Sequence, residues 1–474
     1  MTSLTRRTTV AAAGFALVAL AACGPDEGDG GGDGGGDGEG GGDAGPIVVW
    51  TGDTIPERVT ATEEIIAAFT EETGVEVEFV GVDEDQFVQL LTSAAAAGEL
   101  PDVVGSQPLA GVRTMAANEL INTDAAAAVV EALGEDTFSE RSLEFTREGD
   151  SQLAVPTDAW SQLLFYRKDL FDAAGLAAPE TYDDITAAAE ALDSPEVAGI
   201  VAATTPGDAF TQQTFEHLAL ANGCEMVDES GEVTLDSDQC VASFDFFGDL
   251  MTNYSVTGTQ DVDTVRANYF AGQAAMAIWS TFLLDEMAGL RNDALPTCPE
   301  CQADPAFLAK NSGVVAQLEG PDGEEPAQYG EVSAWVITAD AATEPAQQFV
   351  EYMLTDGYID WLAIAPEGKF PVRTGTEDNP TEYVDAWQDL DIGVDTKAPL
   401  SDFYSQEVVD ILTSGADNLS RWGIIQGQGD LVGASLGELP VPQAVGALVA
   451  GDVDAQGAAD QAAEALRTIQ ASLG

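Results

Sequence analysis

The sequence predicts an α/β protein of two lobes, each built on a mainly parallel sheet flanked by helices, with a cleft between the lobes. About 430 of the 474 residues follow a Gly-rich N-terminal region, and this length is too great for one ordinary hydrophobic core. Apolar, strand-like runs at 47–50, 75–80 and 101–105 alternate with helix-like runs at 57–73 and 87–91. This alternation is typical of a parallel sheet covered by helices on both faces.

Polar and aromatic residues follow two of these strands. Trp50 and Asp53 lie at the end of the first strand, and Ser106 and Gln107 come directly after the third. Because ligands collect beyond the carboxyl ends of parallel strands, we expect these four residues to contact a ligand.

The stretch 153–192 predicts a second α/β unit. It begins as an apolar strand, which we expect to turn through Pro156-Thr157-Asp158 before a second apolar strand at 163–166. Gly175 is able to take the left-handed conformation that ends a short helix. Thr181 then caps a helix that has acidic residues in its first turn. These features alone indicate an ordinary structural unit.

The order of residues within this stretch is more specific. From Val155 it reads Val-Pro-Thr-Asp-x-x-x-x-Leu-Leu-Phe-Tyr-Arg-Lys-Asp-Leu-Phe-x-x-Ala-Gly-Leu-x-x-Pro-x-Thr-Tyr-Asp-Asp-Ile. This closely resembles a segment of the family-1 extracellular solute-binding proteins, the maltose-binding-protein-like receptors of ABC sugar importers. In that family the segment is the first crossing between two lobes. Arg167 departs from the resemblance, because an Asn is more usual there.

Three further segments carry the same resemblance. Residues 269–280 resemble the family's Phe-x-x-Gly-x-Ala-Ala-Met strand, whose loop offers an aromatic ring to the ligand in sugar receptors. Residues 333–338 resemble the next crossing strand, and 368–373 resemble the family's Pro-Val-Arg turn. The resemblance thus extends from Cys23 to the end of the chain.

The resemblance implies a periplasmic-binding-protein-like fold of type II. Lobe 1 is expected at 46–157 and 331–372, and lobe 2 at 158–330 and 373–474. It also implies a monomeric receptor that closes on a sugar or small oligosaccharide and delivers it to the permease subunits of an ABC transporter. No cofactor, metal or covalent chemistry is expected.

Binding a sugar requires flat aromatic faces for the C–H faces of the ring and fixed polar groups for the hydroxyls. The best-placed pairs are Trp50 with Asp53, Asp158 with Trp160, and Trp279 with Phe282. Further candidates are Trp335, Arg373, Trp422, Phe210 and Gln213. For each single Trp, the alternative is a place in the core or on the surface of a lobe.

Catalytic motifs are scarce in this sequence. The only His, His217, has no Ser-nucleophile motif around it, and neither a His-Glu-x-x-His motif nor a Gly-rich phosphate loop is present. Acidic residues are so numerous that counting them does not exclude the paired carboxylates of a glycoside hydrolase. A secreted lipoprotein glycoside hydrolase is therefore the alternative function. Receptors for a polyol or glycerol phosphate share the same scaffold.

The N-terminus predicts export and a lipid anchor. Arg6 and Arg7 precede an apolar run at 10–22 that is too short to span a bilayer, as in a signal peptide. Leu20-Ala21-Ala22-Cys23 resembles a lipobox, so Cys23 is expected to carry lipid. The Gly/Asp-rich residues 23–45 are expected to be a flexible tether. This places the protein at the extracellular face of the cytoplasmic membrane, held by its lipid alone.

The four other Cys residues are expected to form disulfides outside the membrane. The favoured pairing is Cys224 with Cys240 and Cys298 with Cys301, because each bond closes a short loop, although the sequence leaves other pairings open. A zinc site would need four Cys and His ligands close together. His217 lies in a helix-like run near Cys224, where a structural role is favoured.

The net charge is extreme at −67, from 83 Asp plus Glu against 16 Lys plus Arg. This charge excludes nucleic acids and anionic membrane surfaces as partners. The same bias is typical of a halophilic surface adapted to high salt.

Replacing the predicted lipidation site tests the anchor. The Cys23→Ser variant should appear in the growth medium, since a thiol is needed to carry the lipid. Fractionation of cells and medium provides the measurement. A variant retained on the membrane as firmly as the parent chain would locate the anchor elsewhere.

Salt concentration tests the charge interpretation. Carboxylates with few cations repel one another, and this repulsion destabilises the fold where screening is weak. The melting temperature should therefore rise clearly between about 0.1 M and about 2 M NaCl, as the Debye length falls from about 10 Å to below about 3 Å. A melting temperature that stays constant over this range would contradict the high-salt interpretation.

Overall fold

The computed structural model describes residues 45–413 and 415–473. The predicted signal peptide, the lipidation site Cys23 and the tether up to residue 44 lie outside the described residues. Within the described part of the chain, no helix is both long enough and apolar enough to cross a membrane.

The fold opens with the predicted alternation of strands and helices. β1 (Ile47–Thr51), α1 (Pro56–Thr73), β2 (Val77–Gly81), α2 (Glu84–Ala97) and β3 (Val103–Gln107) follow one another in the chain. β2 and β3 flank β1 and run parallel to it. The apolar face of α1 is buried through Ile65, Ile66 and Phe69. α1 then ends at Gly74, whose φ of 78° is the left-handed conformation that favours glycine.

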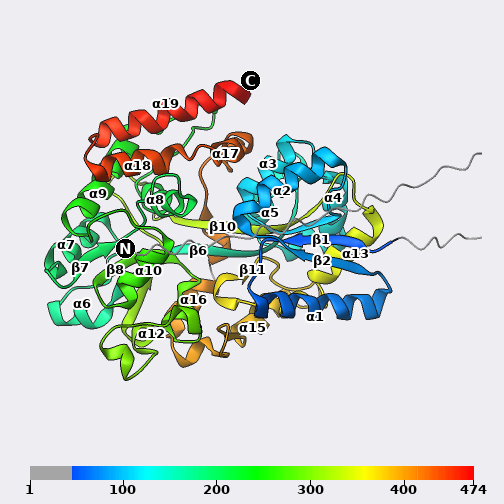
Figure 1. The fold of residues 1–474 in the computed structure, drawn as a ribbon, viewed down its shortest axis with the longest axis horizontal. Coiled ribbons are helices and arrows are strands. Elements are labelled where there is room, and N and C mark those ends of the chain that lie inside the picture. Colours follow the sequence, from blue (N-terminus) through cyan, green and yellow to red (C-terminus); the bar gives the residue numbers. More distant parts are fainter. Residues whose placement is uncertain (1–44, 414, 474) are drawn as a thin grey trace, which may run out of the picture. The chain divides into compact units, whose positions relative to one another are not determined.

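The main sheet has the strand order β2-β1-β3-β10-β6-β8-β7. Its central strands β10 (Gln328–Ile337), β6 (Val155–Arg167) and β8 (Ala274–Ser280) are antiparallel neighbours, whereas β7 (Ala198–Val201) is parallel to β8. The sheet is therefore mixed, and the predicted parallel pairing holds only for its flanks. We call the part around β1 to β3 the β1 half and the part around β7 and β8 the β8 half. Figure 1 shows β6 running between the helices of the two halves.

β6 passes from one half into the other without interruption. Its residues 155–161 pair with β10, and its residues 162–166 pair with β8. β9 (Ser312–Val315) pairs with the end of β6, and β11 (Phe370–Pro371) pairs with Asp158 and Ala159.

The predicted turn at Pro156-Thr157-Asp158 is wrong, because β6 continues straight through these residues. The register of β10 shifts between Ser333 and Ala334, opposite this point. Such an irregularity accommodates a proline, which has no N–H to donate to the sheet.

Helices cover both halves. On the β1 half lie α3 (Leu109–Ala117), α4 (Thr123–Leu133), α5 (Glu140–Phe145), α13 (Thr343–Met353) and α14 (Tyr358–Ala363). On the β8 half lie α6 (Lys168–Ala174), α7 (Tyr182–Leu192), α8 (Ala209–Ala221), α9 (Asp238–Asn253), α10 (Val262–Phe270), α11 (Leu283–Met287) and α12 (Phe307–Asn311).

The chain ends with α15 (Glu382–Gln388), α16 (Gln406–Thr413), α17 (Gly429–Ser435), α18 (Pro440–Ala450) and α19 (Ala455–Leu473). The remaining short strands are β4 (Arg147–Glu148), β5 (Ser151–Gln152), β12 (Asp391–Ile392), β13 (Ala398–Pro399) and β14 (Leu419–Ser420). α17 packs on α3 of the β1 half, whereas α18 and α19 pack on α9 of the β8 half. The C-terminal region therefore contacts both halves.

Aromatic rings fill the core of the β1 half. Trp335 on β10 is fully buried, with its ring against Phe349 of α13 and Trp361 of α14. Gly105 on β3 makes room for this ring, because a Cβ there would lie within 2.0 Å of it.

Both favoured disulfides are confirmed. Cys224 is bonded to Cys240, which joins the loop after α8 to the first turn of α9. Cys298 is bonded to Cys301 in the region between α11 and α12. Among the described residues, no group of three or more His, Cys, Asp and Glu side chains could hold a metal ion.

Candidate functional site

Three aromatic rings meet where β6 leaves β10 for β8. Trp160 is half-buried on β6 and pairs in register with Glu331 of β10. Its ring centroid lies 6.4 Å from that of Phe282, which follows β8, and 6.0 Å from that of Tyr329, which lies on β10. We call this place, together with the polar residues that surround the rings, the crossing junction.

The β1 half reaches the crossing junction through α1. The guanidinium of Arg58 lies 5.6 Å from the ring centroid of Phe282 and forms an ion pair with Asp53 at 3.8 Å. Gly368 lies against the same ring, since a Cβ on it would come within 2.0 Å of a ring carbon. Three of the predicted residues are therefore linked: Arg58 connects Asp53 to Phe282, and Phe282 packs on Trp160. These contacts join residues of both halves.

Several buried polar side chains beside the rings have unused hydrogen-bonding groups. Ser161 and Thr281 are adjacent, because the backbone N–H of Thr281 donates to the carbonyl oxygen of Ser161 at 3.0 Å. Their hydroxyls, both amide atoms of Gln162 and the Nε of Arg58 have no hydrogen-bond partner among the described residues. Buried polar groups in proteins are nearly always paired, so these atoms are suited to contact a polar ligand.

Sequence reasoning missed the polar part of the crossing junction. Ser161, Gln162 and Thr281 were not among the candidates, nor were Arg58 and Tyr329. A signal for the first three was available, since each is a polar residue within or directly after an otherwise apolar strand.

Asp158 has a different environment from the one predicted. It is buried, and its Oδ2 accepts hydrogen bonds from the Thr157 hydroxyl at 2.6 Å and the Trp361 indole N–H at 2.9 Å. The ammonium of Lys369 lies 3.6 Å from the same oxygen and 3.9 Å from the Trp361 ring centroid. The carboxylate is thus satisfied by its protein neighbours and anchors the crossing strand.

A buried ionic network lies behind Tyr329. The Arg421 guanidinium contacts the carboxylate of Glu216 on α8 at 2.7 Å and that of Glu331 on β10 at 3.3 Å, and it lies 4.8 Å from the Tyr329 ring centroid. Glu331 also accepts the backbone N–H of Leu109, at the start of α3, at 2.9 Å. Burial raises the pKa of Glu216, and Arg421 opposes that effect. The network connects the two halves and supports the ring that packs on Trp160.

His217 belongs to the same region. It is buried on α8, and its Nδ1 accepts the backbone N–H of Tyr329 at 3.3 Å. Burial lowers the pKa of His217 to about 3, so the ring is neutral at physiological pH. This agrees with the structural role favoured from the sequence.

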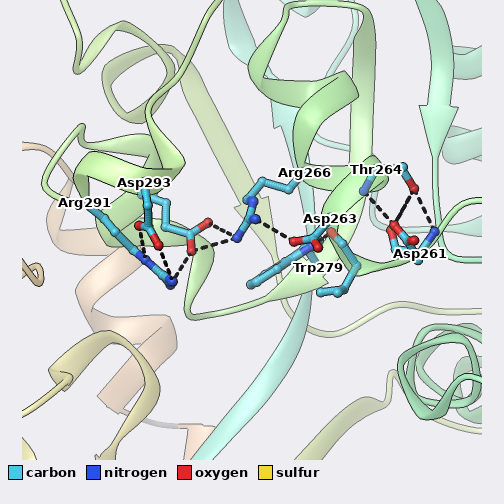
Figure 2. Close-up of polar contacts among 9 residues, drawn as sticks. Asp261, Asp263, Thr264, Arg266, Trp279, Arg291 and Asp293 are labelled. Carbon is cyan, nitrogen blue, oxygen red and sulfur yellow. Dashed lines mark hydrogen bonds and ion pairs between the residues drawn. The ribbon is translucent and has the colours of Figure 1, made fainter. Parts of the chain in front are cut away.

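A second ionic cluster lies on α10, α11 and the loop after α11 (Figure 2). The buried carboxylate of Glu286 accepts hydrogen bonds from Arg266 at 3.1 Å and from Arg291 at 2.9 Å. These arginines also pair with the exposed carboxylates of Asp263 and Asp293. Burial raises the pKa of Glu286 to about 7, even though both arginines oppose the shift.

The remaining predicted residues lie outside the group of three rings. Trp279 is buried, donates its indole N–H to the Val262 carbonyl at 3.0 Å and packs against Phe210 at 5.5 Å. Trp50 is half-buried beside Phe87 of α2, at 6.4 Å. Gln213 is half-buried on α8. Ser106, with a φ of 55°, and the buried Gln107 lie at the end of β3, as predicted.

Three predicted contacts need correction, because the side chains belong to the protein interior. Trp335 lies in the core of the β1 half. The buried Arg373 donates to Thr137, Leu133, Leu354 and Tyr383. Trp422 is buried against Phe215 and donates its indole N–H to the Cys224 carbonyl at 2.7 Å. The polar atoms of Arg373 and Trp422 have protein partners, and the ring of Trp335 packs against Phe349 and Trp361, so these side chains have structural roles.

Two cavities occur away from the three rings. One of about 380 Å³ lies beside β9 and α16, with Tyr166, Gln317 and Glu407 in its wall. Another of about 310 Å³ lies between α1 and α14, with Arg58 and Lys397 in its wall. Trp160, Phe282 and Tyr329 line neither of these two cavities, whereas Arg58 of the crossing junction lies in the wall of the second.

The chain matches known proteins in sequence and in fold. Residues 52–359 match the family model of bacterial extracellular solute-binding proteins. A putative ABC transporter periplasmic-binding protein of Escherichia coli strain K12, YcjN, is 28% identical over 384 residues, which cover 79% of this chain and 83% of that protein.

Solved structures share the fold at lower identity. An ABC transporter solute-binding protein from Thermotoga lettingae TMO, bound with α-D-tagatose, aligns with a TM-score of 0.69 and 20% identity, covering 90% of this chain and 100% of that one. The maltose-bound MalE3 of T. maritima aligns with a TM-score of 0.68 and 18% identity, with the same coverage. These likenesses confirm the two-lobed fold predicted from the sequence. Because the family model matches well over half of its residues, this chain belongs to the bacterial extracellular solute-binding proteins.

Proposed function

We propose that this chain is an extracellular receptor that binds a sugar or small oligosaccharide at the crossing junction and delivers it to the permease subunits of an ABC transporter. The observation that carries the proposal is the meeting of Trp160, Phe282 and Tyr329 beside buried polar side chains with unused hydrogen-bonding groups. Aromatic rings suit the C–H faces of a sugar, and hydroxyl and amide groups suit its hydroxyls.

The ligand is proposed to enter while the two halves are apart. In the closed arrangement, Arg58 of α1 covers the ring of Phe282, which belongs to the β8 half. A sugar between the halves would replace part of this contact and bind both sides. Its binding energy would then favour the closed form, which the permease would recognise.

The electrostatics of the crossing junction favour a neutral ligand. Arg58 lies against Phe282 and already pairs with Asp53, and Arg421 lies against Tyr329 and already pairs with Glu216 and Glu331. A glycerol phosphate would need more positive charge than these pairings leave available. A polyol remains chemically suitable for the hydroxyl-binding groups, although it lacks a flat ring face.

A glycoside hydrolase is the less favoured alternative. The matched family consists of solute-binding proteins, and the similar E. coli protein YcjN is a putative periplasmic-binding protein. The buried carboxylates of Glu331 and Asp158 are held by cations and hydrogen-bond donors, in a way that supports structure. We therefore propose that the chain performs no covalent chemistry.

The lipid anchor, the tether and the boundaries of the lobes are part of the same proposal. Strand pairing supports a division of the fold near residues 158–161 and 328–331, where β6 changes partners. The sequence at 20–23 supports a lipid at Cys23, which would hold the receptor at the outer face of the membrane.

Truncation of the aromatic rings tests the site. Trp160→Ala and Phe282→Ala should each reduce affinity for the bound sugar about ten- to a hundredfold, because each removes apolar contact worth roughly 1.5–3 kcal/mol. Isothermal titration calorimetry with maltose, laminaribiose and D-tagatose, accompanied by melting curves without ligand, measures both effects. Phe246→Ala is the matched control: its ring stacks on Tyr182 at 3.6 Å, outside the three-ring group, so it should lower stability and leave affinity unchanged. Equal affinity losses in all three variants would contradict the site.

Gln162 allows a test in which stability and affinity change in opposite directions. Gln162→Leu should leave unliganded stability unchanged or raised, because the buried amide has no partner, and should weaken sugar binding about 2- to 12-fold through the loss of a neutral hydrogen bond.

The control is Gln152→Leu. The Gln152 amide is also buried, but it bonds to Thr146, Ala154 and Arg147. Its removal should cost about 1–3 kcal/mol of unfolding free energy and should not affect affinity. Unchanged sugar affinity in Gln162→Leu would remove this residue from the site.

A further inference from the structure

The two halves also meet next to the crossing junction, where α11 contacts the short helical turn η4 (Pro366–Gly368). α11 follows β8, whereas η4 precedes β11, and Gly368 of η4 lies against the ring of Phe282. Phe282 forms the N-cap of α11. The contact therefore brings one element from each half together, directly beside the rings proposed to bind the ligand.

Each side of this contact carries a buried carboxylate. Asp285 comes three residues after Phe282, which places it on the same face of α11, and Glu367 is the neighbour of Gly368. Asp285 is 2% exposed and Glu367 is 0% exposed. The Oδ2 of Asp285 and both carboxylate oxygens of Glu367 have no hydrogen-bond partner among the described residues.

It is energetically unfavourable for both carboxylates to be ionised in the buried contact between α11 and η4. Burial raises the pKa of Asp285 well above its ordinary value, and the charge of Glu367 raises it further. Burial also raises the pKa of Glu367, although Arg58 and Lys397 oppose that shift. Two buried acids on elements that contact each other cannot both ionise readily, and a single proton held by the pair removes one of the two buried charges and the repulsion between them.

The charged and titratable groups around the pair come from every element packed on it. They are Asp53, Arg58, Asp158, Arg266, Glu286, Arg291, Lys369, Asp391, Lys397 and Tyr404. Arg266 and Arg291 are committed to Glu286, and Arg58 pairs with Asp53. Lys397 donates to the carbonyl oxygens of Ala363 and Ile364 at 3.1 and 3.2 Å. None of these cations forms an ion pair with Asp285 or Glu367 within the described part of the chain.

We propose that Asp285 and Glu367 share one proton across the contact between the two halves, so that capture of the ligand takes up a proton from solution and weakens as the pH rises. The proposal rests on the proposed function, since it supposes that the ligand draws the halves together.

The direction in which affinity changes with pH follows from the protonation of the pair in the open and closed forms. When the halves are apart, both carboxyls face water and have ordinary pKa values near 4. When the halves close, the shared proton is bound more tightly, so the closed form holds one proton more than the open form. Affinity is then highest at low pH and falls, by up to tenfold per pH unit, as the pH rises from the ordinary pKa to the raised one.

Calorimetric titration of the folded chain with maltose, laminaribiose and D-tagatose tests the proposal. Titrations between about pH 5 and about pH 8, in two buffers of different ionisation enthalpy, give the number of protons taken up with each sugar. We expect uptake approaching one proton within the window in which the affinity falls. The double variant Asp285→Asn/Glu367→Gln, which has neither buried acid, should bind without proton uptake, and its affinity should stay at the low-pH level of the parent chain.

The matched control is Glu225→Gln. Burial raises the pKa of Glu225 to about 7, but this carboxylate bonds to Gln426 on the β8 half and takes no part in the contact between α11 and η4. This variant should keep the pH dependence of the parent chain. Sugar binding with no proton uptake, or uptake that survives in the double variant Asp285→Asn/Glu367→Gln, would overturn the proposal.

A measurement without ligand separates this proposal from the proposed function. Small-angle X-ray scattering of the unliganded chain should show a smaller radius of gyration at about pH 5 than at about pH 8, and the double variant Asp285→Asn/Glu367→Gln should remain compact throughout. This compaction, combined with no binding of any of the three sugars, would support the shared proton and contradict the sugar-binding function. A radius that responds to pH equally in the parent chain and in the double variant would overturn the shared proton.

Discussion

The passage of β6 through both halves of the molecule is the constraint on which the rest of the structure depends. A strand needs backbone partners along its whole length, and β6 obtains them from β10 over residues 155–161 and from β8 over residues 162–166. The change of partners marks where the sheet passes from one half into the other. Trp160, Ser161 and Gln162 lie at this change, and the side-chain polar atoms of Ser161 and Gln162 have no hydrogen-bond partner among the described residues. The proposed ligand site thus lies where a single strand joins the two halves.

Buried charge holds the two halves in register around this strand. Moving a lone charge out of water costs several kcal/mol, so buried carboxylates need cations or hydrogen-bond donors. Asp158 has Lys369 and Trp361, Glu331 has Arg421 and the Leu109 N–H, and these partners come from other parts of the sheet and its helices. Asp285 and Glu367 differ from this pattern, because no lysine or arginine of the described residues forms an ion pair with them, and the proton proposed above relieves their charge instead.

The sequence was sufficient for the fold and for part of the candidate site. The segment from Val155 and the run at 269–280 identified the family, and local chemistry identified α1, the strand ends and both disulfides. The prediction of a turn at 156–158 was wrong because pairing with β10 and β11, which are distant in sequence, outweighs the local preference of Pro156. Trp335 and Trp422 were misplaced for a related reason. An aromatic residue near a strand end has the same local pattern whether it faces the core or a ligand.

Residues that act through distant contacts carry no such pattern. In the sequence, Arg58 has the pattern of an ordinary helix residue, and only the fold shows that it lies against Phe282. Glu367 is likewise one of 83 acidic residues, and only the fold shows that η4 contacts α11. Because lysines and arginines are few, their positions in the fold determine which carboxylates they can offset. Several of the 16 lysines and arginines, including Arg113, Arg373 and Arg421, are buried and serve internal carbonyls or carboxylates. Cations used inside the molecule are not available to offset the carboxylates on its surface. We therefore expect dissolved salt to relieve the surface repulsion, whereas the buried pair Asp285 and Glu367 is shielded from salt and is proposed to respond to protons.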